Sequence, residues 1–160
     1  MTTTEGEREE LPLSKAAEFL LDECRMVLPG IQALFGFQLI VVFSPGFGEK
    51  LGHAEQRAHL MAITLVAVAV AMIMTPAALH RQAGARHVTD RFVRVSTRLL
   101  LWSMFPLAVS ICIDFALIAR VIVGSEAVAW LSAALFGVFI VFWLILPRLE
   151  VLQRVFEGRR

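Results

Sequence analysis

The stretch LLLWSMFPLAVSICIDFALIARVIV, residues 99–123, decides the fold of this 160-residue chain. A helix that crosses a bilayer needs about 20 apolar residues at a rise of about 1.5 Å each, and this stretch is long and apolar enough to form one. A single carboxylate, Asp114, interrupts it. Because a carboxylate facing hydrocarbon costs about 3 kcal/mol on insertion scales, we expect Asp114 to face other helices, water or a partner rather than lipid.

Three serines precede Asp114 at helical intervals. Ser96, Ser103, Ser110 and Asp114 follow one another at seven, seven and four residues. Side chains at these intervals lie along one face of a helix. We therefore predict that this polar stripe is the buried face of the helix.

Composition places the chain in the membrane class. Of its residues, 58% are hydrophobic and 18% are charged, and the formal net charge is +1. These values disfavour a soluble core and give no bulk attraction to nucleic acid. The two cysteines, Cys24 and Cys112, are expected at depths too different for a disulfide, so we interpret both as reduced packing residues. The acidic N-terminus lacks the basic region of a signal peptide, so no cleavage is expected.

Four apolar segments predict an all-α integral membrane protein, a four-transmembrane-helix bundle with short amphipathic cytoplasmic helices at both ends. The expected spans, within a membrane domain at residues 27–147, are 27–47, 60–79, 99–123 and 127–146. An acidic tail with an amphipathic helix is expected at 1–26, and a second amphipathic segment at 148–160.

The distribution of lysine and arginine predicts the orientation. The two terminal segments and the loop between the second and third spans carry twelve of the fifteen, and the remaining three lie in or next to the other two loops. By the positive-inside rule, both termini are then cytoplasmic.

Small and amide side chains inside the spans predict contacts between helices. Gln32 and Gln38 lie in the first span, and Gln38, at mid-depth, is a candidate hydrogen-bond partner of Asp114. Small residues recur every four positions in two other spans, which lets another backbone approach closely. These helix-packing candidates are Ala67, Ala71 and Thr75 in the second span, and Ala129, Ala133 and Gly137 in the fourth.

Asp114 has two interpretations. Intramembrane carboxylates bind the proton or cation in many ion-coupled transporters, which makes it a candidate ion site. Alternatively, it is a packing carboxylate bonded to Gln38, to a serine or to an arginine of another subunit. A coupled transporter usually has more than one intramembrane ionisable group or an internal repeat, and no repeat between the halves is evident, which favours the packing role.

No catalytic or metal-binding constellation is recognisable. His53, Glu55 and His59 lie in HAEQRAH, but the spacing is not that of the HExxH zinc motif, so we predict a solvated loop at 49–59 and no metal site. No nucleophile with its base, cofactor fingerprint or nucleic-acid module is found. We expect a protein that is not an enzyme, holds no cofactor and binds no nucleic acid.

The segments DECRMVLPGIQALFGFQ, FSPGF and MTPAALHR carry a resemblance that covers most of the chain. The chain resembles an uncharacterised bacterial family of small four-span membrane proteins, some labelled automatically as sodium/proton antiporters. It is also similar to a four-span accessory subunit of mammalian-cell-entry (Mce) lipid importers, which are ABC transporters. The residues that match the first family are Glu23, Arg25, Leu28, Pro29, Gly30, Gln32, Pro76, His80 and Arg81.

The resemblance implies a protein of the bacterial cytoplasmic (inner) membrane. We expect an accessory subunit that docks on a larger membrane complex, with an ABC-type lipid importer as the implied partner, and stabilises or regulates it. Glu23, Arg25, His80 and Arg81 are candidates for contact with a partner or a lipid head group. The alternative is a proton- or sodium-coupled secondary transporter that acts as a homo-oligomer through Asp114. A third possibility is a lipid-binding or stress-response membrane protein.

Overall fold

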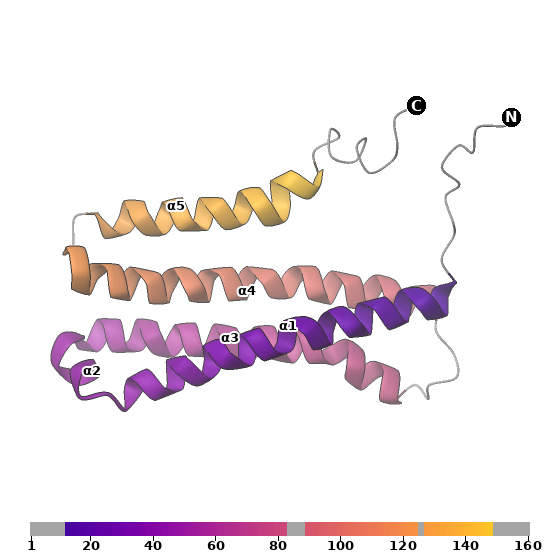
Figure 1. Cartoon of the computed structure of the whole chain (residues 1–160), viewed down its shortest axis with the longest axis horizontal. Helices are drawn as coiled ribbons and strands as arrows, with labels where there is room; N and C mark the ends of the chain where they lie inside the picture. The colour runs from indigo at the N-terminus through magenta and orange to yellow at the C-terminus, as the bar shows by residue number, and fades with distance from the viewer. Residues whose placement is uncertain (1–11, 83–88, 125–126, 149–160) are drawn as a thin grey trace, which may run out of the picture.

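The structure is a computed structural model of the chain, and it describes residues 12–82, 89–124 and 127–148. These residues are helical throughout apart from short connections, with no strand among them (Figure 1). The helices are α1 (Leu13–Val42), α2 (Pro45–Lys50), α3 (His53–Gln82), α4 (Asp90–Val123) and α5 (Val128–Ile140). A π-helical turn, Val141–Ile145, and a 3₁₀ turn, Leu146–Arg148, continue α5.

Four helices are long and apolar enough to cross a membrane. They are Leu13–Val42, His53–Gln82, Asp90–Val123 and Val128–Arg148. The predicted class, an all-α membrane protein with four spans, is confirmed. The protein is therefore a multi-pass membrane protein.

Helix α1 joins two elements that the sequence analysis separated. The predicted amphipathic helix and the first span form one helix of 30 residues with Pro29 inside it. Proline removes one backbone hydrogen bond and normally breaks or kinks a helix. Here, one stripe of buried side chains continues across it, so packing against the other helices outweighs the local cost. These buried residues are Ala17, Leu20, Cys24, Ile31 and Gln38.

The solvated loop predicted at residues 49–59 is wrong. Helix α2 occupies its first part, and α3 begins at His53 rather than near residue 60. The prediction stopped where the apolar run stopped, but the helix continues through charged residues. The Glu55 carboxylate accepts a hydrogen bond at 2.6 Å from the backbone N–H of Gly52, the residue just before α3. Side-chain acceptors for such N–H groups stabilise the start of a helix.

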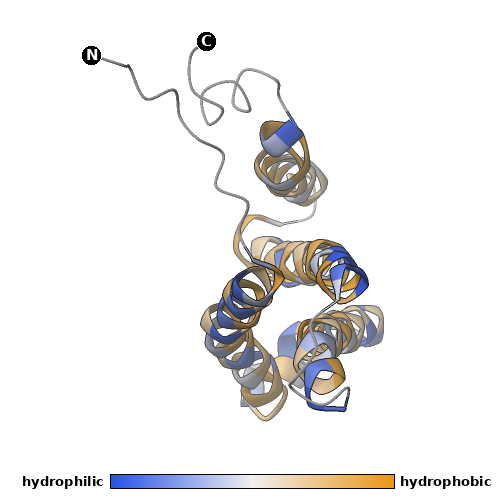
Figure 2. Ribbon diagram, turned by 90° about the vertical axis from the view of Figure 1, so that its right-hand side faces the viewer, coloured by the Kyte–Doolittle hydropathy of each residue, from blue (hydrophilic) through white to orange (hydrophobic). Residues whose placement is uncertain are grey.

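Helices α1, α3 and α4 form the core, and α5 lies against the outer side of α4 (Figures 1 and 2). Helix α1 runs obliquely across the α3–α4 pair (Figure 1). Viewed end-on, α1, α3 and α4 group together and α5 lies at the side of that group (Figure 2). The buried apolar cluster belongs to α1 and α3 and comprises Leu20, Cys24, Ile31, Val66 and Ile73. None of the described residues of α5 is buried.

The α3–α4 interface is built from small side chains. Ser96, Ser103 and Ser110, the serines of the predicted stripe, are all buried on α4. The Ser110 hydroxyl donates to the backbone carbonyl of Ala62 on α3 at 2.9 Å, which requires a close approach of the two backbones. The stripe is therefore the face through which α4 packs on α3.

The predicted rows of small residues are not the faces through which the helices pack within the chain. On α3, Ala67 and Ala71 are exposed and Thr75 is half-buried, whereas the buried residues of this helix are His59, Ala62, Val66, Ala69, Ile73 and Pro76. On α5, Ala129 and Ala133 are exposed, and nothing lies within 4 Å of where a Cβ on Gly137 would be. Helix α3 has small residues on two faces, and spacing along one helix cannot tell which face packs within the chain. The predicted C-terminal amphipathic segment and acidic tail, apart from residues 12–26 and 148, lie outside the described residues.

Candidate functional site

A network of four polar side chains joins α1, α3 and α4 inside the bundle. Gln38 comes from α1, His59 from α3, and Ser110 and Asp114 from α4. Gln38, His59 and Ser110 are 3%, 5% and 0% exposed, and the Asp114 side chain is 17% exposed. His59 is six residues into α3, about 9 Å along it at 1.5 Å per residue. The network therefore lies toward the end of the bundle at which α2 connects α1 to α3.

Gln38 and Ser110 form one arm of the network. The Gln38 amide Nε2 donates to Asp114 Oδ2 at 2.5 Å and to Ser110 Oγ at 3.0 Å. Ser110 in turn donates to the carbonyl of Ala62. The contact between Gln38 and Asp114 that the sequence suggested is thus present, with Ser110 beside it.

His59 forms the other arm. Its Nδ1 lies 3.0 Å from Asp114 Oδ1, and its Nε2 lies 2.9 Å from the backbone carbonyl oxygen of Gln38. Phe47 of α2 packs edge-on against the imidazole, with ring centroids 5.4 Å apart. The sequence pattern predicted a loop around His59 and did not indicate its place in the network. The available signal was helical spacing: Ala62 follows His59 by three residues, and Val66 follows Ala62 by four. This spacing puts all three on the buried face of α3.

The contacts of His59 show how many protons the pair holds. A backbone carbonyl can only accept, so Nε2 carries a hydrogen. The Nδ1–Oδ1 contact then holds one shared proton, which belongs either to an imidazolium beside a carboxylate or to a carboxylic acid beside a neutral imidazole. Both arrangements have zero net charge. Losing the shared proton would leave a carboxylate facing an imidazole lone pair, with a net charge of −1 inside the membrane.

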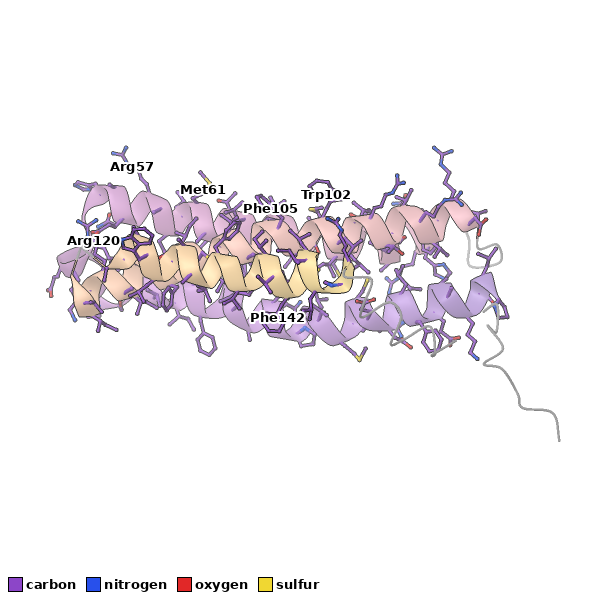
Figure 3. All side chains as sticks on the ribbon, turned by 90° about the horizontal axis from the view of Figure 1, so that it is seen from above. Arg57, Met61, Trp102, Phe105, Arg120 and Phe142 are labelled. Carbon is purple, nitrogen blue, oxygen red and sulfur yellow. The ribbon has the colours of Figure 1, made fainter. Side chains whose placement is uncertain are left out.

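One described ion pair lies near the network, at the same end of the bundle. Arg120 Nε lies 2.8 Å from Glu55 Oε1, which joins the C-terminal end of α4 to the start of α3. Arg57 and Arg120 lie at the same end of the bundle (Figure 3). Arg120 thus pairs with Glu55, and the described side-chain partners of Asp114 are His59 and Gln38. The site is therefore a neutral pair rather than a charged cluster.

A cavity of about 440 Å³ opens beside the pair, between α1, α2 and α4. Gln38, His59 and Asp114 line its base, and Lys50 also lines it. The remaining walls are mostly apolar and include Leu34, Phe37, Val41, Leu117, Ile118 and Val121. The buried Gln38 Oε1 has no hydrogen-bond partner among the described residues. The cavity thus combines apolar walls with a polar base.

The remaining predicted site residues lie apart from the network. Glu23 and Gln32 are exposed, and Arg25 pairs with Asp22 at 3.2 Å on the surface of α1. His80 packs against Phe92 with ring centroids 5.9 Å apart. Arg81 is exposed in the last turn of α3, at the opposite end of that helix from His59.

Among the described residues, no group of three or more His, Cys, Asp or Glu side chains is placed to hold a metal ion. His59 faces the network and Glu55 faces Arg120, so the HAEQRAH segment does not converge on one point. A second cavity, of about 280 Å³, lies between α4 and α5, where Arg98 and Arg148 accompany Trp102 and Trp143.

The fold and the network define a multi-pass helical membrane protein with a buried, hydrogen-bonded His–Asp pair. Residues 6–147 match DUF6328, a family of unknown function, and the chain belongs to this family. No curated protein and no solved structure matches the chain. The family has no assigned activity, so neither sodium/proton antiport nor lipid import follows from membership.

Proposed function

We propose that the protein is a secondary transporter that exchanges a proton for a cation at the His59–Asp114 pair. The observation that carries this proposal is the 3.0 Å contact between two ionisable side chains of different helices inside the bundle. From sequence, Asp114 stood alone, and that favoured a packing role. With His59 beside it, the site has the second intramembrane ionisable group that coupled transport usually employs.

Exchange follows from the charge of the pair. With its shared proton the pair is neutral, and without it a charge of −1 is left in a poorly solvated place, which is costly. A cation that enters as the proton leaves restores neutrality. Proton and cation then compete for one position, and this competition couples their movements.

We further propose that the transporter lies in the bacterial inner membrane with both termini cytoplasmic. Four spans put the start of α1 and the end of α5 on the same side of the membrane, and the positive-inside rule makes that side cytoplasmic. A homo-oligomer suits this function because four helices leave little room for two gates. The exposed Ala67 and Ala71 offer a surface on α3 for a second copy.

Proton flux in proteoliposomes tests the exchange. Liposomes with an acidic interior and a trapped pH dye should lose their pH gradient when an external cation is added. Asp114→Asn should abolish this flux, because an amide cannot hold the shared proton. Asp90→Asn is the matched control, since Asp90 is an exposed carboxylate near Arg94 on the same helix. Wild-type flux in Asp114→Asn, with the fold intact by circular dichroism, would exclude the proposal.

A second proposal is the accessory subunit of a larger membrane complex, such as an ABC-type lipid importer. Its support is α5, which lies against α4 and has no buried residue, and whose Ala129 and Ala133 are exposed. Native purification in mild detergent with mass spectrometry tests it. Co-migration of a permease would support this role, and recovery of the protein alone or as a homo-oligomer would contradict it.

A further inference from the structure

The cavity beside the His59–Asp114 pair has a chemistry that selects a class of ligand. We propose that it binds a hydrophobic ammonium ion, a protonated amine with an apolar body, whose N–H groups reach the Asp114 carboxylate. This inference rests on the proposed function, because it names the cation that replaces the proton.

Hydrogen-bond accounting at the base of the cavity shows what a ligand must supply. Within the network the donors are used: His59 Nε2 bonds the Gln38 carbonyl, the Gln38 amide bonds Asp114 and Ser110, and the Ser110 hydroxyl bonds a backbone carbonyl. Acceptors remain. A carboxylate accepts about four hydrogen bonds, and the described contacts of Asp114 are those with Gln38 and His59. A ligand that fits this base therefore brings donors.

The walls indicate the size and polarity of the rest of the ligand. A volume of about 440 Å³ with mostly apolar walls is typical of sites for small organic molecules. A bare metal ion is a poor fit, because hard cations prefer several oxygen ligands and Asp114 is the one carboxylate among the lining residues. A lipid tail would leave the acceptors unpaired. An ammonium group on an apolar body satisfies both the walls and the base.

The charge of the ammonium replaces the shared proton, so one proton leaves for each ligand that enters and the net charge stays zero. Lower pH then favours the proton and weakens ligand binding. The other described charges facing the pair are Lys50 from α2, and Glu55 of α3 with its partner Arg120 of α4. Lys50 is exposed, where salt screens its charge, and Glu55 and Arg120 neutralise each other. From α1, the pair meets the uncharged Gln38.

Three matched probes test the ligand class with the full-length protein in lipid nanodiscs. They are 2-naphthylmethylammonium, its N-trimethyl analogue, which has no N–H donor, and 2-naphthalenemethanol, which is neutral. Calorimetric titration in two buffers of different ionisation enthalpy measures affinity and proton release together. We expect the primary ammonium to bind at least tenfold more tightly than either analogue and to release about one proton, as one carboxylate site requires.

Two kinds of variant localise the binding. Asp114→Asn should abolish it, and Ile118→Trp, which fills the cavity from an exposed wall position and leaves the network intact, should also abolish it. Asp90→Asn, at an exposed position outside the cavity, should keep the affinity within threefold. Equal binding of all three naphthyl probes, or unchanged binding to Ile118→Trp, would overturn the inference and indicate an apolar or lipid-filled cavity.

The two proposals fail in different ways. If sodium ions drive proton flux in liposomes but the ammonium does not bind, the ligand class is wrong and the proposed exchange stands. If the ammonium binds at the cavity without releasing a proton, the ligand class stands and the proposed exchange is wrong.

Discussion

Asp114 has a partner for each carboxylate oxygen. Oδ1 lies 3.0 Å from His59 Nδ1, and Oδ2 accepts from Gln38 Nε2 at 2.5 Å. A buried polar group that loses its partner costs about 1–3 kcal/mol, so either neighbour of Asp114 is more important to stability than an exposed residue of the same type. At the residue scale, the three side chains therefore act as one unit.

A double-mutant cycle on His59→Ala and Asp114→Ala measures this dependence. Each single variant leaves the other member buried without its partner, so each should lower the free energy of unfolding. The double variant should lose less than the sum, with a coupling of about 0.5–3 kcal/mol. Unfolding in mixed micelles with increasing sodium dodecyl sulfate provides the measurement.

The exposed pair Asp90–Arg94, with 3.7 Å between its charged atoms, is the control for that cycle. Its coupling should be no more than about 0.5 kcal/mol, because exposed i,i+4 pairs are weak. Additive effects of the His59 and Asp114 variants would show that the two do not form the pair described above.

The start of α3 and the end of α4 are held together by one side chain. Glu55 accepts from Gly52 N at 2.6 Å and from Arg120 Nε at 2.8 Å, and it is largely buried. These bonds hold the first turns of α3, which carry His59 toward Asp114. At the element scale, an interaction outside the apolar run thus supports the position of the site.

Glu55→Ala should destabilise the protein by about 1–2 kcal/mol, since it removes both a helix-start hydrogen bond and an ion pair. Glu55→Gln keeps an oxygen for Gly52 N and should cost less. Glu49→Ala, an exposed position on α2, is the control and should change stability by less than about 0.5 kcal/mol. The same micelle unfolding assay applies, and equal stability of Glu55→Ala and Glu49→Ala would contradict this role.

The two small-residue faces of α3 allow a matched comparison. Ala69 is fully buried, so Ala69→Ile should overpack the bundle and cost about 1–3 kcal/mol. Ala67 is exposed, so Ala67→Ile should leave the stability of the single chain unchanged. If the outer face is the contact between copies, Ala67→Ile should also dissociate the homo-oligomer, as measured by light scattering in detergent. An unchanged oligomer would exclude that face as the contact.

The described spans place the network asymmetrically across the membrane. α2, the start of α3, the end of α4 and the start of α5 lie at one end of the bundle, and the end of α3 and the start of α4 lie at the other (Figure 1). The network and its cavity belong to the end that carries α2. At the scale of the whole molecule, the proposed orientation puts this end away from the cytoplasm.

Cysteine labelling in intact cells tests that orientation. Cys24 and Cys112 are buried and free, so an impermeant maleimide should not label them. Arg57→Cys, at the α2 end, should be labelled in intact cells, and Arg81→Cys, at the other end of α3, only after permeabilisation. Labelling in the reverse order would show that the protein has the opposite orientation, and equal labelling in intact cells would contradict the span of α3.

Sequence patterns identified part of the site. Asp114, Gln38 and Ser110 stood out because polar side chains are rare inside apolar runs and because their spacing indicates a face. His59 did not stand out by its polarity, since it lies just before the apolar run, among charged residues, and only its spacing from Ala62 and Val66 indicated a buried face. The predicted family likeness is confirmed only as membership of a family of unknown function, and the likenesses to antiporters and to an Mce subunit stay predictions.

By itself, the sequence determined the all-helical membrane class, the four spans and the polar stripe of α4, because hydropathy and helical periodicity are local properties of the chain. Only the tertiary structure decided that α1 continues through Pro29, which face of α3 packs inward, and that His59 meets Asp114 beside an apolar cavity. These features depend on how helices cross and in which register they pack. Crossing and register result from many contacts between residues far apart in the chain, and no short segment encodes them.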